Sequence, residues 1–287
     1  MKSRGLKIGT AVLIAALCLL LAGIRTYVLA VELDPLTGFA APGQGRWQNV
    51  FLAVLLVGTA VTAALCFFGR RAVGKDGVSG LPVGVRWVGA AAAVAVAADA
   101  VVGSVRAVQA LGLPLGVLLT LAKLAVAYSV FAQGLFFTGG RPLALHPASA
   151  AVETVPVLYC IAILLDAFLN YVAYNSTSQH LIEQISVIAV MLFFLSTLSF
   201  CVKVNRTGDA VLAVASGLLG LLYLSVTALP PLAVFLITGN LPAFLTKAVG
   251  FSPVMGLCLA AYLGAFSLSA LLQRTPKKAQ VLDKTDA

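Results

Sequence analysis

The chain has 287 residues, of which 61% are hydrophobic and only 10% are charged, and its formal net charge is +9. Soluble globular domains contain about 25% charged residues, so this composition and a mean hydropathy of +1.03 exclude a soluble domain and predict a membrane protein. The basic residues are scattered in short clusters between apolar segments and do not line one face, which argues against nucleic-acid binding.

Apolar runs of roughly 18 to 25 residues, long enough to cross a bilayer as helices, recur almost from end to end. We therefore expect one all-α transmembrane domain over residues 1–272, a polytopic helical bundle of about eight spans. The predicted spans are 8–24, 50–68, 87–105, 113–137, 154–174, 181–200, 210–229 and 253–272. The polar segment 273–287 is expected to form a disordered cytoplasmic tail.

The first span follows three basic residues, Lys2, Arg4 and Lys7. A basic start before an apolar run is typical of a signal anchor or of a cleaved signal peptide, and residues 28–30 weakly resemble a cleavage site. We favour the anchor, because Arg25 lies between the apolar run and that site.

The loop after the first span contains the sequence Asp34-Pro35-Leu36-Thr37-Gly38. Asp34 can accept hydrogen bonds from backbone groups near Thr37, and Gly38 can adopt a positive φ, so these residues predict a fixed turn at the outer membrane surface. With Arg25 before it and a Pro-Gly pair after it, this D-P-x-T-G segment resembles uncharacterised polytopic membrane proteins of clostridial bacteria. The resemblance covers about 25 residues and implies no particular activity.

The distribution of basic residues predicts the topology. With eight spans and a cytoplasmic amino terminus, most of the 19 Lys and Arg residues fall in inner segments. The outer segments hold only four: Arg25, Arg46, Arg106 and Lys247. This asymmetry follows the positive-inside rule. We expect both termini inside and a multi-pass protein of the bacterial cytoplasmic membrane.

Residues 230–252 interrupt the pattern of spans. Pro230-Pro231 is expected to break or bend the seventh helix, because proline lacks the amide hydrogen that a helix needs. The apolar residues 232–237 that follow are too few to cross. We expect this region to be a kinked extension or a shallow re-entrant segment, with residues 243–249 along the interface.

Three ionisable residues lie within predicted spans: Asp99, Lys123 and Asp166. Such a residue near the middle of a membrane helix costs roughly 2.5 to 3.5 kcal/mol on insertion scales, so it is usually paired or placed on a water-filled path. Counted from the outer ends of their helices at about 1.5 Å per residue, the three depths agree within about 6 Å. We expect the three side chains to meet in the outer half of the bundle.

The fifth predicted span carries a polar stripe. Tyr159, Asp166, Asn170 and Tyr174 are spaced by seven, four and four residues, which places them on one face of a helix. A polar stripe should face protein or water instead of lipid. These residues, with Asp99 and Lys123, form the predicted site for a small solute or ion. Arg25 and Glu183 are expected to extend this site toward the outer surface.

Three interpretations of this charge cluster remain open. In the first, an ion pair between Lys123 and an acid locks the register of the helices. In the second, the charged residues line a polar cavity that binds a solute or relays protons. In the third, no ion pair forms and the Lys123 side chain extends toward the membrane interface. Two acids against one base favour a functional role, because the second acid needs a proton, a cation or a further donor.

The sequence offers no sign of an enzyme, a metal site or a cofactor. The five cysteines, Cys18, Cys66, Cys160, Cys201 and Cys258, lie in or near apolar runs and form no C-x-x-C pair, so we expect small core residues. The two histidines are expected in loops on opposite sides of the membrane. The predicted function is therefore a small-solute or proton-coupled transporter, or a non-transporting scaffold or regulatory subunit, with the lipid bilayer as its environment.

Overall fold

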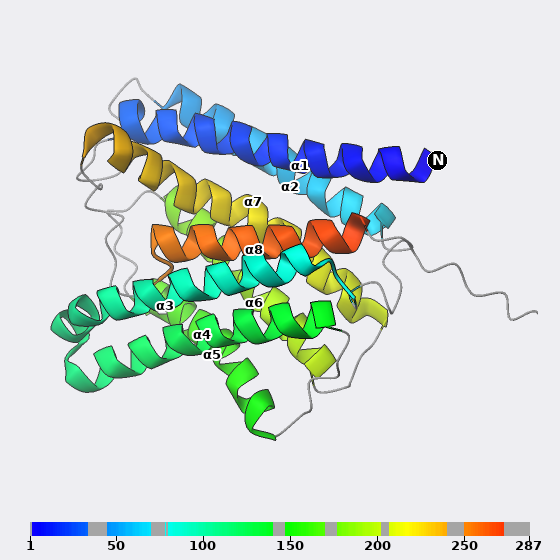
Figure 1. The fold of residues 1–287 in the computed structure, drawn as a ribbon. Coiled ribbons are helices and arrows are strands. Elements are labelled where there is room, and N and C mark those ends of the chain that lie inside the picture. The colour runs from blue at the N-terminus through cyan, green and yellow to red at the C-terminus, as the bar shows by residue number, and fades with distance from the viewer. Residues whose placement is uncertain are drawn as a thin grey trace, which may run out of the picture.

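The computed structural model describes residues 2–33, 45–69, 78, 80–139, 147–169, 177–201, 207–239 and 250–272. These residues form an all-α bundle. The α-helices are α1 (Lys2–Tyr27), α2 (Arg46–Gly69), α3 (Val83–Leu111), α4 (Leu113–Gly139), α5 (Pro147–Leu169), α6 (Thr177–Cys201), α7 (Thr207–Thr238) and α8 (Pro253–Leu272), and a short π-helix, η1 (Val28–Glu32), follows α1. Figure 1 shows these helices running roughly side by side.

Seven of the described helices are long and apolar enough to cross a membrane: α1, α2, α3, α4, α6, α7 and α8. The predicted class, a polytopic transmembrane helical bundle, is therefore confirmed, and the protein is a multi-pass membrane protein. The remaining described α-helix, α5, has 23 residues. The predicted span 154–174 continues past its end into residues outside the described part, so the count of eight stays a prediction.

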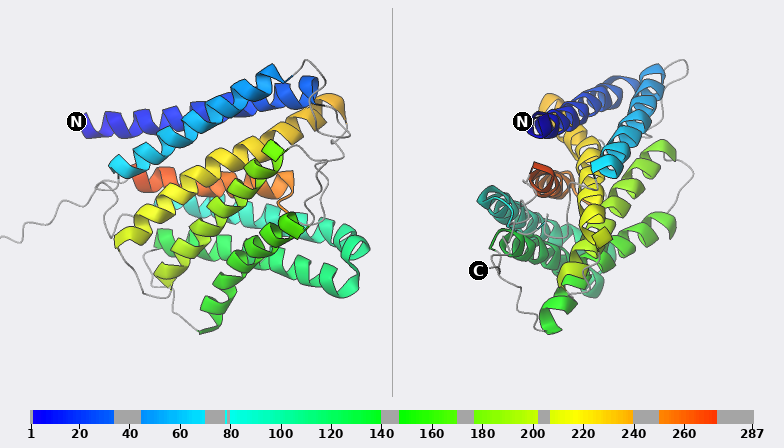
Figure 2. Two further views of the ribbon diagram at one scale, coloured as in Figure 1. Left: turned by 180° about the vertical axis from the view of Figure 1, so that it is seen from behind. Right: turned by 90° about the vertical axis from the view of Figure 1, so that its right-hand side faces the viewer.

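Helix α7 lies at the centre of the bundle. It packs against α1, α2, α6 and α8, and the right-hand view of Figure 2 shows it between these neighbours. Of the seven candidate spans α7 is the most buried, with 67% of its apolar window inside the protein against 28% for α2 and for α3. Helices α2 and α3 therefore present much of their apolar surface outward, as expected for helices in contact with lipid.

Helices α3 and α4 form an antiparallel hairpin. Gly112, with φ +80°, ends α3, and its amide donates a hydrogen bond to the carbonyl of Val108. Few residues other than glycine adopt this backbone conformation. The hairpin packs onto α8 through α3 and onto α5 through α4, which brings the polar residues of four helices to one interface.

Glu32 joins the first two helices. Its side chain is buried, and its carboxylate oxygens accept hydrogen bonds from the backbone amides of Trp47 and Gln48, both at 3.1 Å. A negative charge at a helix N-terminus satisfies amides that have no partner within the helix. Glu32 thus fixes the start of α2 against the end of η1. The predicted turn at Asp34, Thr37 and Gly38 lies outside the described residues.

The prolines of α7, which were predicted to break or bend the helix, do not end it. Helix α7 continues through Pro230 and Pro231 to Thr238, so it includes the apolar residues 232–237. Figure 1 shows its last turns bending away from the rest of the helix. The alternative of a kinked extension therefore fits residues 230–238, whereas residues 240–249 and the tail 273–287 lie outside the described part.

Candidate functional site

Lys123 and Asp99 form a salt bridge across the α3–α4 hairpin. The Nζ atom of Lys123 lies 3.9 Å from Oδ2 of Asp99, and the two side chains are 10% and 18% exposed. The predicted meeting of these two residues is observed, and the interpretation in which Lys123 extends alone to the interface is wrong. The distance is at the long end for an ion pair. The contribution of this pair to stability therefore comes mainly from the attraction between two charges that are poorly hydrated.

Other groups gather around Asp99. Gly103, one turn further along α3, lies beside the ammonium group, since a Cβ atom there would lie at ordinary contact distance, 3.9 Å, from Nζ of Lys123. Asp99 belongs to the hairpin that packs onto α8 through α3 and onto α5 through α4.

The predicted stripe on the fifth span is only partly described. Tyr159 is buried, and its hydroxyl donates a hydrogen bond to the carbonyl oxygen of Gly250 at 3.1 Å. Asp166 is half-buried, and within the described part of the chain it lies outside salt-bridge distance of Lys123. Asn170 and Tyr174 lie outside the described residues. The ion pair thus contains one of the two predicted acids.

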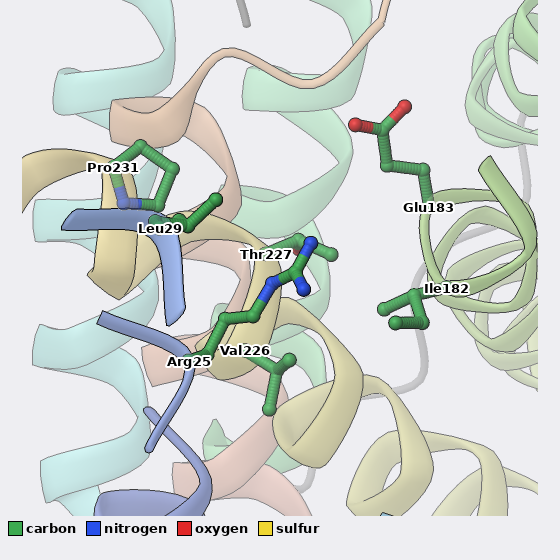
Figure 3. Close-up of a pocket in the computed structure, with 7 residues that line it drawn as sticks. All are labelled: Arg25, Leu29, Ile182, Glu183, Val226, Thr227 and Pro231. Atoms are coloured by element: carbon green, nitrogen blue, oxygen red, sulfur yellow. The ribbon is translucent and has the colours of Figure 1, made fainter. Parts of the chain in front are cut away.

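Arg25 and Glu183 line a separate pocket between α1, α6 and α7. Figure 3 shows the guanidinium group of Arg25 and the carboxylate of Glu183 on different walls of this space. Its lining residues are Arg25, Leu29, Ile182, Glu183, Val226, Thr227 and Pro231. We call it the outer pocket, because it lies at the ends of the three helices that the topology predicts to be outside.

Arg25 is held firmly in the outer pocket. Its residue is only 4% exposed, and its guanidinium carbon lies 5.1 Å from the centre of the Phe51 ring. Stacking of this kind fixes the plane of a guanidinium group, whose donors then point in set directions. Glu183 acts on Arg25 electrostatically from the facing wall, so the pocket contains both a fixed cation and a carboxylate.

The prolines of α7 add backbone acceptors at this place. In a regular helix the carbonyls of Val226 and Thr227 would accept hydrogen bonds from the amides four residues later. Those positions are Pro230 and Pro231, which have no amide hydrogen. Val226 and Thr227 both line the outer pocket, so the acceptors released by the prolines belong to the same residues that surround Arg25.

The structure separates what the sequence predicted as one cluster. Helix α1 packs mainly against α7 and α2, whereas the hairpin that carries Lys123 and Asp99 packs onto α8 and α5. Figure 2 shows α7 and α8 between α1 and the hairpin. The expectation that Arg25 and Glu183 extend the Lys123 cluster is therefore replaced by two polar sites on different sides of α7.

A third polar group, which sequence reasoning missed, links α4, α5 and α6. It consists of Ser129, Gln133, Glu153 and Thr197, all at most 2% exposed. Oε2 of Glu153 lies 2.5 Å from Oγ of Ser129 and 3.0 Å from Nε2 of Gln133, and the same nitrogen lies 3.1 Å from Oγ1 of Thr197. We call these four residues the inner network, because they lie toward the predicted cytoplasmic ends of their helices.

Glu153 was missed because the predicted fifth span began at residue 154. The helix begins earlier, at Pro147, and proline at the first position of a helix is a recognised start signal. The inner network could have been predicted from this start signal together with the spacing of four residues between Ser129 and Gln133. His180, expected in a loop, lies instead in the first turns of α6 and is buried.

In the described part of the chain, no group of three or more His, Cys, Asp or Glu side chains is arranged to hold a metal ion. Among the cysteines there, Cys18, Cys66 and Cys160 are free and buried, as expected of core residues. Comparisons with protein-family models, curated proteins and solved structures find no match to this chain.

Proposed function

We propose that this protein is a small-solute transporter of the bacterial cytoplasmic membrane, with its solute site in the outer pocket. The observation that carries the proposal is the buried guanidinium of Arg25, which lines one pocket together with Glu183. A charged group buried in protein costs free energy unless it is paired, so a buried guanidinium that lines a pocket is a candidate for binding an anionic group.

The chemistry of the outer pocket favours a small zwitterion. The guanidinium group of Arg25 can bind a carboxylate through two hydrogen bonds. An ammonium group can donate hydrogen bonds to the Glu183 carboxylate, to the Thr227 hydroxyl and to the backbone carbonyls of Val226 and Thr227. These carbonyls are available because proline has no amide hydrogen to donate to them. An amino acid carries both charges in one small molecule.

Binding of a mixture of tritiated amino acids to the purified protein tests this proposal. We expect saturable binding that falls at least tenfold in Arg25→Lys, which keeps the charge but lacks the planar fork. Glu183→Gln should also weaken binding, because it removes the carboxylate that faces the ammonium group. Arg106→Lys, at an exposed position of α3, is the matched control and should bind as the native protein does.

The proposal fails if the native protein binds no amino acid, or if folded Arg25→Lys and Glu183→Gln variants bind as well as the native protein does. A change in Arg25 can disturb packing against Phe51, so each variant is first checked for unchanged helix content and thermal stability. Loss of binding in a variant that has also lost stability does not count in favour of the site.

A non-transporting scaffold or regulatory subunit is the second candidate, and the Lys123–Asp99 salt bridge favours it. The pair joins two helices of one hairpin, with both side chains largely buried, as expected of a structural lock. A scaffold predicts that variants of this pair lose stability while no amino acid binds the outer pocket. A transporter with a structural lock predicts both lower stability in those variants and binding at Arg25.

A further inference from the structure

We propose that Glu153 is a proton-binding site in the inner half of the bundle, and that its carboxyl group is protonated at neutral pH. The proton is held between Glu153 and Ser129 within the inner network. This site lies away from the outer pocket, on the interface of α4, α5 and α6.

The hydrogen-bond geometry around Glu153 suits a neutral carboxyl group. Oε2 lies 2.5 Å from the hydroxyl oxygen of Ser129, which donates a hydrogen bond to it. The amide of Gln133 donates to the same oxygen at 3.0 Å. The amide also has Oγ1 of Thr197 as an acceptor at 3.1 Å, and the Gln133 carbonyl accepts a hydrogen bond from the Tyr262 hydroxyl at 3.4 Å. Each of these partners is an uncharged group.

No cation compensates a charge on Glu153 within the described part of the chain. The groups that face it are Ser129 and Gln133 from α4 and Thr197 from α6, with Tyr262 of α8 behind Gln133. On its own helix, Tyr159 and Asp166 lie further along. Arg86 of α3, whose backbone lies beside Gly134 of α4, is an exposed residue. A carboxylate that is 2% exposed and has two neutral donors would be poorly stabilised, so a bound proton is favoured.

Glu32 provides an internal contrast. It is also buried, at 7% exposure, but its two oxygens each accept a hydrogen bond from a backbone amide at the N-terminus of α2. The chain therefore contains two buried glutamates with different surroundings: Glu32 has backbone donors at a helix N-terminus, whereas Glu153 is bonded by side chains of neighbouring helices.

The position of Glu153 suggests a use for the proton. Six residues separate Glu153 from Tyr159 on α5, and six separate Ser129 from Lys123 on α4, which is about 9 Å along each helix. The Asp99–Lys123 pair and the inner network therefore lie about two helical turns apart along α4. If the proposed transport function holds, Glu153 is the group that couples it to protons; the proton site itself does not depend on that function.

Infrared difference spectroscopy of the full-length protein in lipid nanodiscs tests the site without any solute. We expect a carbonyl-stretch band of a protonated carboxyl at neutral pH, a band that moves to lower frequency in D₂O and is missing in Glu153→Gln. The native protein should lose this band only at alkaline pH. A solvated glutamate would already have lost its proton well below neutrality, since its ordinary pKa is about 4.3.

Two further variants keep the test decisive if Glu153→Gln does not fold. Ser129→Ala leaves the carboxyl in place but removes its closest hydrogen-bond partner, so the band should move to higher frequency. Glu32→Gln is the matched control and should leave the band unchanged. The proposal is overturned if the native protein shows no protonated-carboxyl band at neutral pH, or if the band persists in Glu153→Gln, or if it does not move in Ser129→Ala.

Discussion

At the scale of single residues, burial decides which polar groups need partners. Lys123, Arg25 and Glu153 are each at most 8% exposed, and each side chain has a different kind of partner. Lys123 has an acid within 3.9 Å, Arg25 has an aromatic face and a carboxylate across a pocket, and Glu153 has only neutral donors. From these three environments we propose a structural pair, a binding group and a proton site respectively.

Replacing Lys123 with Met should lower the free energy of unfolding by about 2 kcal/mol, because Asp99 is left without its cation. A fully buried pair would lose roughly 3–5 kcal/mol, and the loss is smaller here because the Asp99 side chain is 18% exposed. Lys123→Met combined with Asp99→Asn should recover part of this loss. Thermal unfolding in detergent measures each step.

Leu121→Met, at an exposed position of the same helix, is the control for the added methionine and should change little. If Lys123→Met is as stable as the native protein, or if Asp99→Asn brings no recovery, the pair does not lock the hairpin.

At the scale of elements, close approach of backbones and proline positions shape the helices. Pro230 and Pro231 leave α7 continuous but remove two of its hydrogen bonds, and the residues that lose them line the outer pocket. In the α3–α4 hairpin, Gly116 lies so close to α3 that a Cβ atom would be 2.5 Å from Cα of Val108. Small residues at such contacts let membrane helices pack without a hydrophobic driving force.

Gly116→Ala should destabilise the hairpin by about 1–3 kcal/mol, because the clash is with backbone and no side-chain rotation relieves it. Gly103→Ala, in the same hairpin, should be neutral or slightly stabilising, since the nearest atom to its new Cβ lies 3.9 Å away and alanine favours helices. Thermal unfolding of the two variants in detergent compares them directly. Equal stability of Gly116→Ala and Gly103→Ala would contradict the close approach at Gly116.

At the scale of the whole molecule, the number of spans depends on α5. Seven helices qualify as spans by length and apolarity within the described residues, and the charge distribution predicts eight with both termini inside. If α5 crosses, the end of α4 and the start of α6 lie on opposite sides of the membrane.

Cysteine labelling of intact cells tests whether α5 crosses. Thr177→Cys, at the first residue of α6, should react with a membrane-impermeant maleimide from outside. Gly139→Cys, at the last residue of α4, should react only after the membrane is permeabilised. The native protein, with its own cysteines, gives the background. Reaction of both variants from the same side would reduce the count to seven spans.

The sequence by itself determined the fold class and the main spans, because the cost of exposing polar backbone to lipid leaves helices as the form that long apolar runs adopt. It also placed Lys123 and Asp99 at matching depths, since depth follows from counting residues along a helix. Counting cannot give rotation about the helix axis or the choice of neighbours. Those depend on packing, so only the tertiary structure separated Arg25 and Glu183 from the Lys123 pair and brought Glu153 to Ser129.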